Sequence, residues 1–395
     1  MNPAPDSQTL ATRQFFLGCL RACLAVTNQP ASPLPAAPLN WELFLKLAAF
    51  HRVGPLLERA LRLGRLSELP ALVRAGLESL AHANSMRGLL LTAELARLLK
   101  GWQILGIQAL PFKGPSLSLH LYDDPTLRHY DDLDVFVRQA DFSAARAHLI
   151  SLGYQPQPPE AGEDFHETFK LPHPDRPLEV ELHWSLMPEN RTQHFTPETF
   201  WARCATATVG GAPALALSTE DLLLFLCLHG SKHGWNRLLW LCDVTQLLRH
   251  YPQLDWDSLL SRARQAQGLH MLLLGLFLAR ELLGAPLSPV LEQALRRKPA
   301  VARLAEPIRR RHFRGPQVTF AKSWQDENFR AQLEDSSLGR FTYRLRLLVT
   351  PTANDLNILL LPRTLYPIYY LIRPFRLLGK YGSMAARQIM VRLRK

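Results

Sequence analysis

The stretch PFKGPSLSLHLYDDPTLRHYDDLDVFV, residues 111–137, decides the fold that we expect. A turn at Lys113 and Gly114 follows a short apolar run, and the stretch closes on a strand that carries Asp132 and Asp134. Because side chains alternate between the faces of a strand, both aspartates project from one face. Two such carboxylates repel each other unless a cation lies between them, and oxygen ligands suit Mg²⁺ or Mn²⁺. The stretch therefore predicts a divalent-metal site.

A further group of polar residues is predicted in FHETFKLPHPDRPLEVELHWSL, residues 165–186. The pattern is typical of two strands joined by the turn HPDRP. In the second strand Glu179, Glu181 and His183 share one face, while apolar side chains share the other. A third carboxylate on a neighbouring strand is what a two-metal site would need.

The order of these motifs resembles the DNA polymerase β-type nucleotidyltransferase superfamily. More narrowly, the motifs LPFKG, DDLDVFV, LGY and ELHW are similar to an uncharacterised nucleotidyltransferase family found in bacteria, and the likeness runs from about residue 40 to RPFRLLGKY. The resemblance implies an α+β fold, with a polymerase β-like mixed sheet flanked by N-terminal and C-terminal α-helical units. It also implies transfer of a nucleoside monophosphate from an NTP to an acceptor hydroxyl, with release of pyrophosphate.

The resemblance makes Asp132, Asp134 and Glu181 the candidate catalytic residues and metal ligands, with Glu179 as the alternative third carboxylate. One metal would activate the acceptor oxygen, and the other would neutralise charge on the triphosphate. Glu181 would also receive the acceptor proton. His183 either orients the substrate or is a structural histidine held by hydrogen bonds.

Phosphate-binding residues are expected around the lysine-glycine turn. Gly114 lets the backbone approach phosphate oxygens, and Lys113 offers a positive charge. Because the next residue is a proline without an amide hydrogen, Ser116 or Lys113 would replace that contact. Arg128 either binds a phosphate or pairs with Asp131, and the sequence leaves both open.

A basic group is predicted where the helix that begins after Ser218 ends. His229, Lys232 and His233 lie there, and they form either a rim that contacts the nucleotide phosphate or base, with Asp243 as a supporting partner, or a structurally satisfied cluster. Two histidines at i,i+4 suit a metal, but no third ligand is spaced for it, and we reject a zinc site.

The length and composition of the chain are those of a globular protein with a sizeable core. The chain has 395 residues, 47% hydrophobic and 20% charged, and a net charge of +12 that favours an anionic partner such as nucleotide, nucleic acid or acidic lipid. We divide it into an N-terminal helical unit, a nucleotidyltransferase core, a helical domain and a basic C-terminal helical region, at residues 1–103, 104–210, 211–300 and 301–395. In the first unit His51 and Arg52 are the one polar pair of interest, and we expect a structural role.

The remaining expectations concern location and partners. Five cysteines without a CxxC pair indicate neither a disulfide framework nor a zinc knuckle, which favours the cytoplasm. The apolar segment 356–378 is interrupted by arginines and prolines, so we expect no transmembrane helix there, but either peripheral contact with an anionic membrane or packing on the enzyme. The acceptor is a small molecule, a protein or a tRNA. The alternative function is a non-catalytic nucleotide-binding or membrane-surface accessory protein of polysaccharide or peptide biosynthesis.

Overall fold

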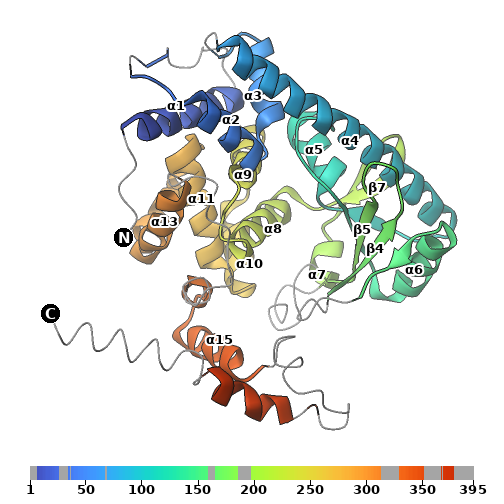
Figure 1. Ribbon diagram of the computed structural model, residues 1–395. Coiled ribbons are helices and arrows are strands. Elements are labelled where there is room, and N and C mark those ends of the chain that lie inside the picture. The colour runs from blue at the N-terminus through green and yellow to red at the C-terminus, as the bar shows by residue number, and fades with distance from the viewer. Residues whose placement is uncertain are drawn as a thin grey trace.

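The computed structural model combines one mixed β-sheet with helices that precede and follow it (Figure 1). The structure describes residues 7–25, 34–35, 37–66, 69–158, 165–185, 197–312, 329–350, 366 and 368–377. Sheet and helices occur in the predicted order, so the expected α+β class with flanking helical units is confirmed. The predicted domain boundaries stay a prediction.

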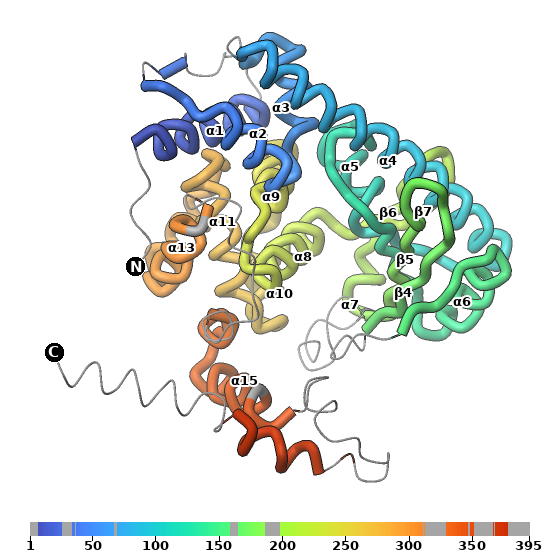
Figure 2. The backbone as a smooth tube through the Cα atoms, in the orientation of Figure 1, coloured from blue at the N-terminus to red at the C-terminus, as the bar shows by residue number. Residues whose placement is uncertain are grey.

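Four helices form the N-terminal unit: α1 (Ser7–Leu24), α2 (Trp41–Phe50), α3 (Gly54–Arg62) and α4 (Ala71–Ile104). Helix α2 begins after its cap, Asn40, whose side-chain oxygen accepts a hydrogen bond from the Leu43 amide at 2.9 Å. Helix α4 is a single helix of 34 residues. It extends from the other N-terminal helices along the sheet, as the tube in Figure 2 makes clear.

The sheet has the strand order β1-β2-β5-β4-β3, with β1 (Ala109–Pro111), β2 (Leu133–Val137), β3 (Gln155–Pro156), β4 (His166–Leu171) and β5 (Leu178–His183). Strands β2 and β5 are parallel, and the other neighbours are antiparallel. Strands β4 and β5 form the predicted hairpin. Helix α5 (Gly114–Tyr122) connects β1 to β2, and the 3₁₀ turn η1 (Gln139–Asp141) and α6 (Phe142–Ser151) follow β2.

The two faces of β2 pack against different parts of the molecule. Leu133, Val135 and Val137 belong to a buried cluster with side chains of α4 and α6. Phe136 points to the other face, where it packs on Phe200 at a ring-centroid distance of 5.0 Å, next to helix α7 (Pro197–Trp201). The alternation that placed Asp134 opposite the core is therefore observed, since Asp134 shares this second face with Phe136.

A short hairpin that the sequence analysis did not predict follows α7. Strands β6 (Ala205–Val209) and β7 (Ala212–Ala216) are joined by Gly210 and Gly211, which both have positive φ angles, 55° and 74°. Two central residues with positive φ suit the twist of a tight two-residue hairpin, and glycine adopts them at low cost. The boundary that we predicted at residue 210 falls in this turn.

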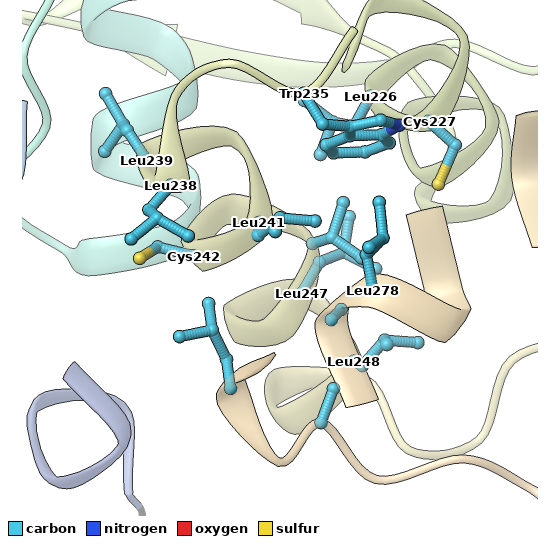
Figure 3. Close-up of a cluster of buried hydrophobic side chains, with 14 of the residues drawn as sticks. Leu226, Cys227, Trp235, Leu238, Leu239, Leu241, Cys242, Leu247, Leu248 and Leu278 are labelled. Carbon is cyan, nitrogen blue, oxygen red and sulfur yellow. The ribbon is translucent and has the colours of Figure 1, made fainter. Parts of the chain in front are cut away.

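The helices after the sheet are α8 (Thr219–Lys232), α9 (Leu238–His250), α10 (Trp256–Gln265), α11 (Leu269–Leu283), α12 (Pro289–Arg296), α13 (Pro299–His312) and α15 (Ser337–Val349). Trp235, in the turn between α8 and α9, is fully buried beside Leu226 and Cys227 (Figure 3). A Cβ atom at Gly230 or Gly275 would lie 2.4 or 2.7 Å from its ring, so these glycines let α8 and α11 close on the indole. This packing fixes the end of α8, where the predicted basic group lies.

The C-terminal region bears on two expectations. Among the described residues no helix has both the length and the apolar character that a membrane crossing requires. Of the segment 356–378 the structure describes residues 366 and 368–377, and residues 379–395 lie outside the described residues. All five cysteines are free, as expected from their spacing.

Candidate active site

The floor of the site is built by the parallel pair of β2 and β5. The register places Asp134 opposite Glu181, so their side chains leave the sheet on the same face as neighbours. Asp134 is almost completely buried, and its Oδ1 accepts a hydrogen bond from Lys113 Nζ at 2.6 Å. The glutamate at the site is thus Glu181, whereas Glu179 lies 3.2 Å from Lys170 at the other end of the strand.

His183 completes a compact group on this floor. Its Nε2 lies 3.3 Å from Asp134 Oδ1 and 3.3 Å from Glu181 Oε2, yet the geometry gives neither ring nitrogen a hydrogen-bond partner. One potential ligand atom from each of the three residues lies within 4.8 Å of the others, a spacing that a metal ion bridges. His166 stacks on the His183 ring from the opposite position of β4. The alternation along β5 was the signal that could have added His183 to the predicted ligands.

Asp132 stands one residue before β2 and lines the same pocket, but it is not part of the compact group of Asp134, Glu181 and His183. Burial and the nearby Asp134 raise the pKa of Asp132 to about 7. Asp134 behaves oppositely, because Lys113 and His183 outweigh the effect of burial and lower its pKa.

The same carboxylates shift the pKa values of the two basic residues of the floor, Lys113 and His183. Burial alone would lower the pKa of Lys113, but the charges of Asp134, Glu181 and Asp132 raise it. Burial likewise opposes protonation of His183, and its close contacts with Asp134 and Glu181 raise its pKa. The floor therefore concentrates negative charge that attracts cations.

The lysine-glycine turn lies directly above this floor. Gly114 has a φ of 58°, and a Cβ atom there would come within 3.2 Å of the backbone oxygen of Asp132. Glycine is thus required both by the left-handed backbone and by the close approach of the acidic strand. Ser116 lies in the first turn of α5 but is not among the described residues that line the pocket.

The pocket has a volume of about 340 Å³ and lies between the sheet and α8. All of the predicted site residues except Ser116 line it. Lys232 supplies positive charge from the α8 side, where its Nζ lies 5.0 Å from the centre of the Phe165 ring. Burial and Lys232 lower the pKa of His233 to about 3, and burial and Lys113 lower the pKa of His229 well below its ordinary value. Both histidines are therefore neutral, and the rim is less basic than its composition indicated.

Arg128 occupies a closed part of the pocket wall. Its Nε lies 3.0 Å from Asp243 Oδ2, and the Tyr122 hydroxyl donates to Asp243 Oδ1 at 2.9 Å. Asp131, the partner that the sequence left open for Arg128, instead contacts Arg52 at 2.7 Å and also Arg176. Asp243, expected to support the basic group of α8, thus supports Arg128.

A mixed sheet with neighbouring acidic side chains beside a glycine turn has the features that the motifs predicted for a nucleotidyltransferase. The family model described as "Uncharacterised nucleotidyltransferase" matches residues 37–284, more than half of the chain, and the chain belongs to this family. The protein is accordingly a nucleotidyltransferase enzyme.

Two other comparisons add little. No curated protein matches the chain. It is similar to the crystal structure of an antigenic nucleotidyltransferase-like protein from Paracoccidioides brasiliensis, with 16% identity over 50% of this chain and 94% of that one and a TM-score of 0.32. We base no conclusion on a similarity of that size.

Proposed function

We propose that the enzyme transfers a nucleoside monophosphate from an NTP to an acceptor hydroxyl in a reaction that depends on Mg²⁺ or Mn²⁺. The observation that carries this proposal is the register of Asp134 with Glu181, which gathers two carboxylates on a pocket floor beside Lys113 and Gly114. The family supplies the reaction class, and the floor supplies the acidic ligands that such a reaction needs.

The donor set on the floor fits a divalent cation. Asp134 and Glu181 offer oxygens, and the His183 ring has close carboxylate contacts but no hydrogen-bond partner for either nitrogen. Carboxylate oxygens suit Mg²⁺, and an added imidazole nitrogen also suits Mn²⁺. When bound, such a cation polarises the acceptor and phosphate oxygens. Asp132 would join the set from the edge of the same pocket.

In the proposed transfer the acceptor oxygen forms a bond to the α-phosphorus of the NTP, and the bond from that phosphorus to the bridging oxygen of pyrophosphate breaks. Pyrophosphate leaves with the electron pair of that bond. Glu181 accepts the hydroxyl proton, because its carboxylate is partly exposed at the pocket floor and its pKa is lowered, so it is available as a base.

The remaining residues bind and position the nucleotide. Lys113 would exchange part of its contact with Asp134 for a phosphate oxygen, and the Gly114 turn lets the triphosphate approach the backbone. Ser116 would contribute its hydroxyl from the first turn of α5. Lys232 would attract phosphate from the α8 side, with the neutral rings of His229 and His233 beside the base.

Arg128 acts on phosphate only through guanidinium nitrogens other than Nε, which faces Asp243. Its main contribution in this proposal is positional. The buried Arg128–Asp243 pair joins the segment before β2 to α9 and so fixes the pocket wall.

The test is NTP binding and turnover in the double variant Asp132→Ala with Asp134→Ala. With Mg²⁺ and each of four α-labelled NTPs, wild-type protein binds at least one of them. We expect the double variant to lose binding by about 100-fold while its circular dichroism is unchanged, since the loss of two ligands removes the charge that holds the cation. Unchanged Mg²⁺-dependent binding in that variant would refute the proposal.

Peripheral contact with an anionic membrane is favoured by one observation on α15. Leu338, Phe341, Leu345 and Leu348 recur at helical spacing and are all between 40% and 71% exposed. Arg344 and Arg346 lie between these positions on the same helix, and a helix with apolar and basic residues of this kind is typical of contact with an anionic surface. Flotation with phosphatidylserine vesicles tests this, because Phe341→Glu with Leu345→Glu should abolish co-flotation if α15 makes the contact; equal flotation would exclude it.

A further inference from the structure

A second cavity lies beside the pocket, and most of its lining residues belong to the N-terminal helices. It has a volume of about 590 Å³, within the range of small-molecule sites. The two cavities share Arg52 and His129 in their linings, so they are neighbours. A molecule bound in the second cavity would therefore lie next to the proposed nucleotide.

The wall of this cavity is apolar and comes from facing helices. Ala48 and Ala49 of α2 oppose Leu80, Ala83, Met86 and Leu90 of α4. The alanines leave the space open, and Ala49 and Ala83 are exposed, as is Met86 with 62% of its surface. An apolar concavity of this size favours the apolar part of a ligand.

The mouth of the cavity carries an excess of positive charge. Arg52, Arg87 and Arg176 line it together with only two acids, Asp131 and Asp175. Asp131 organises this mouth, since its carboxylate contacts Arg52 and Arg176 while its backbone oxygen accepts from Arg87 Nη2 at 3.1 Å. Such a mouth favours a ligand with a negatively charged group.

Arg52 is the side chain that connects the two cavities. Its backbone has a φ of 60°, a left-handed conformation that costs a non-glycine residue about 1–2 kcal/mol. The preceding residue, His51, is buried and accepts a hydrogen bond from the Leu238 amide at 3.3 Å, which anchors the end of α2. The left-handed residue Arg52 closes the Schellman motif at the end of α2, where its own amide and that of Val53 donate to the Ala49 and Ala48 oxygens at 3.1 and 3.0 Å, and the motif holds Arg52 at the boundary between the two cavities.

We propose that this second cavity binds the acceptor, and that the acceptor is a small molecule with an apolar body and an anionic group next to its reactive hydroxyl. The role of the ligand as the acceptor rests on the proposed transfer reaction, whereas the presence of a ligand-binding site in this cavity does not. The apolar body lies between α2 and α4, the anionic group contacts the guanidinium groups of the mouth, and the hydroxyl passes Arg52 to reach the nucleotide.

The probe for this site is 1-anilinonaphthalene-8-sulfonate, which combines an apolar ring system with one sulfonate. We would measure its saturable fluorescence in wild type, Ala83→Trp, Ala49→Trp and Arg52→Gln. The two exposed alanines tolerate a large side chain, which would fill the cavity. His82→Trp is the matched control, because His82 is exposed on the same helix and is not among the residues that line the cavity. Thermal melting of each variant verifies folding.

We expect the Kd of the probe to rise by about tenfold or more in both tryptophan variants and severalfold in Arg52→Gln, with no change in His82→Trp. Equal binding in wild type and the tryptophan variants would overturn the assignment of a binding site. Mg²⁺-dependent binding of ATP, or of whichever NTP the wild type binds best, is measured in parallel and should be retained in Ala83→Trp. Loss of nucleotide binding there would instead assign the cavity to the nucleotide and overturn the acceptor proposal.

The same experiment separates this inference from the proposed function. The double variant Asp132→Ala with Asp134→Ala should bind the probe like wild type, although it no longer binds the nucleotide. If wild type binds no nucleotide but the tryptophan variants still lose the probe, the transfer reaction fails and the ligand site stands.

Discussion

Two buried ion pairs lie near the pocket, and they differ in what surrounds them. Arg128 and Asp243 are both nearly inaccessible, and Tyr122 donates a further hydrogen bond to the carboxylate. Lys113 and Asp134 form a shorter pair, 2.6 Å against 3.0 Å, but two more acids, Glu181 and Asp132, line the same pocket beside it. The first pair is balanced and closed, whereas the second has an excess of negative charge exposed to a cavity.

The difference separates structural charge from charge that is available to a ligand. Removing one partner of a balanced buried pair leaves the other charge without compensation, so such a pair is needed for stability. In the crowded group Lys113 and His183 stabilise the Asp134 carboxylate, whereas burial and the nearby Asp134 disfavour the charged form of Asp132, so the charge of Asp132 has a cost in stability that a bound cation would offset. Substitutions in the closed pair should therefore mainly lower stability, and substitutions in the acidic group should mainly lower nucleotide binding.

The largest effect on stability is expected at the closed pair. Asp243→Asn should lower the free energy of unfolding by about 3–5 kcal/mol, because the Arg128 guanidinium stays buried without its counter-charge. Urea denaturation measures this. Tyr122→Phe is the control, since it removes one hydrogen bond to the carboxylate, worth about 1.5–3 kcal/mol, and keeps the Arg128–Asp243 pair. A cost near that of the control would show that the pair is not structurally important.

A smaller effect on stability is expected for Asp132→Asn, about 1 kcal/mol or less, because burial and the nearby Asp134 already disfavour the charged form of Asp132 in the folded protein. The same variant should lose Mg²⁺-dependent nucleotide binding, which Asp243→Asn keeps as long as it is folded. If both variants have equal costs in urea and equal binding, the distinction between the pairs is wrong.

The turn above the floor gives a comparison between two glycines. Gly114→Ala should cost about 2 kcal/mol, because it adds a contact of 3.2 Å with the Asp132 oxygen to the strain of a left-handed alanine. Gly106→Ala has the same kind of backbone, with φ of 73°, but no atom within 4 Å of its Cβ, and should cost about 1 kcal/mol. Thermal denaturation measures both, and an equal loss would mean that the strand can move away from the turn.

The smallest effect concerns pH. Burial, then the nearby His312, Arg237 and Arg13, lower the pKa of His51. A lowered pKa in the folded state means that the unfolded state binds the proton more tightly, so stability is complete above the ordinary histidine pKa of about 6.5 and is lost as pH falls below it.

Replacement by His51→Asn keeps an acceptor for the Leu238 amide and removes the titration. Below pH 6.5 we expect wild-type stability to fall faster than that of the variant by up to about 1.4 kcal/mol per pH unit. Parallel slopes in urea denaturation at pH 6.5, 6.0 and 5.5 would mean that another group carries the dependence.

Features that depend on neighbouring residues could be predicted from the sequence. The cap at Asn40, the lysine-glycine turn and the hairpin around HPDRP follow from local residue types, and the alternation along β2 and β5 put the acids on one face. The roles of Asp132, Asp134 and Glu181 remain a prediction.

Features that depend on distant contacts could not be predicted. Arg128 and Asp243 are 115 positions apart, and no local pattern indicates that they pair. Burial also makes His229 and His233 neutral, although their composition indicated a basic rim. Arg52 was expected to be structural, and only the arrangement of α2 and α4 shows it lining two cavities.

The most direct test of the central claim is an anomalous difference map from crystals soaked with Mn²⁺ and a non-hydrolysable NTP. The account predicts a Mn²⁺ peak coordinated by oxygens of Asp134 and Glu181, with the triphosphate beside Lys113. A map with the nucleotide bound and Mn²⁺ away from both carboxylates would contradict it.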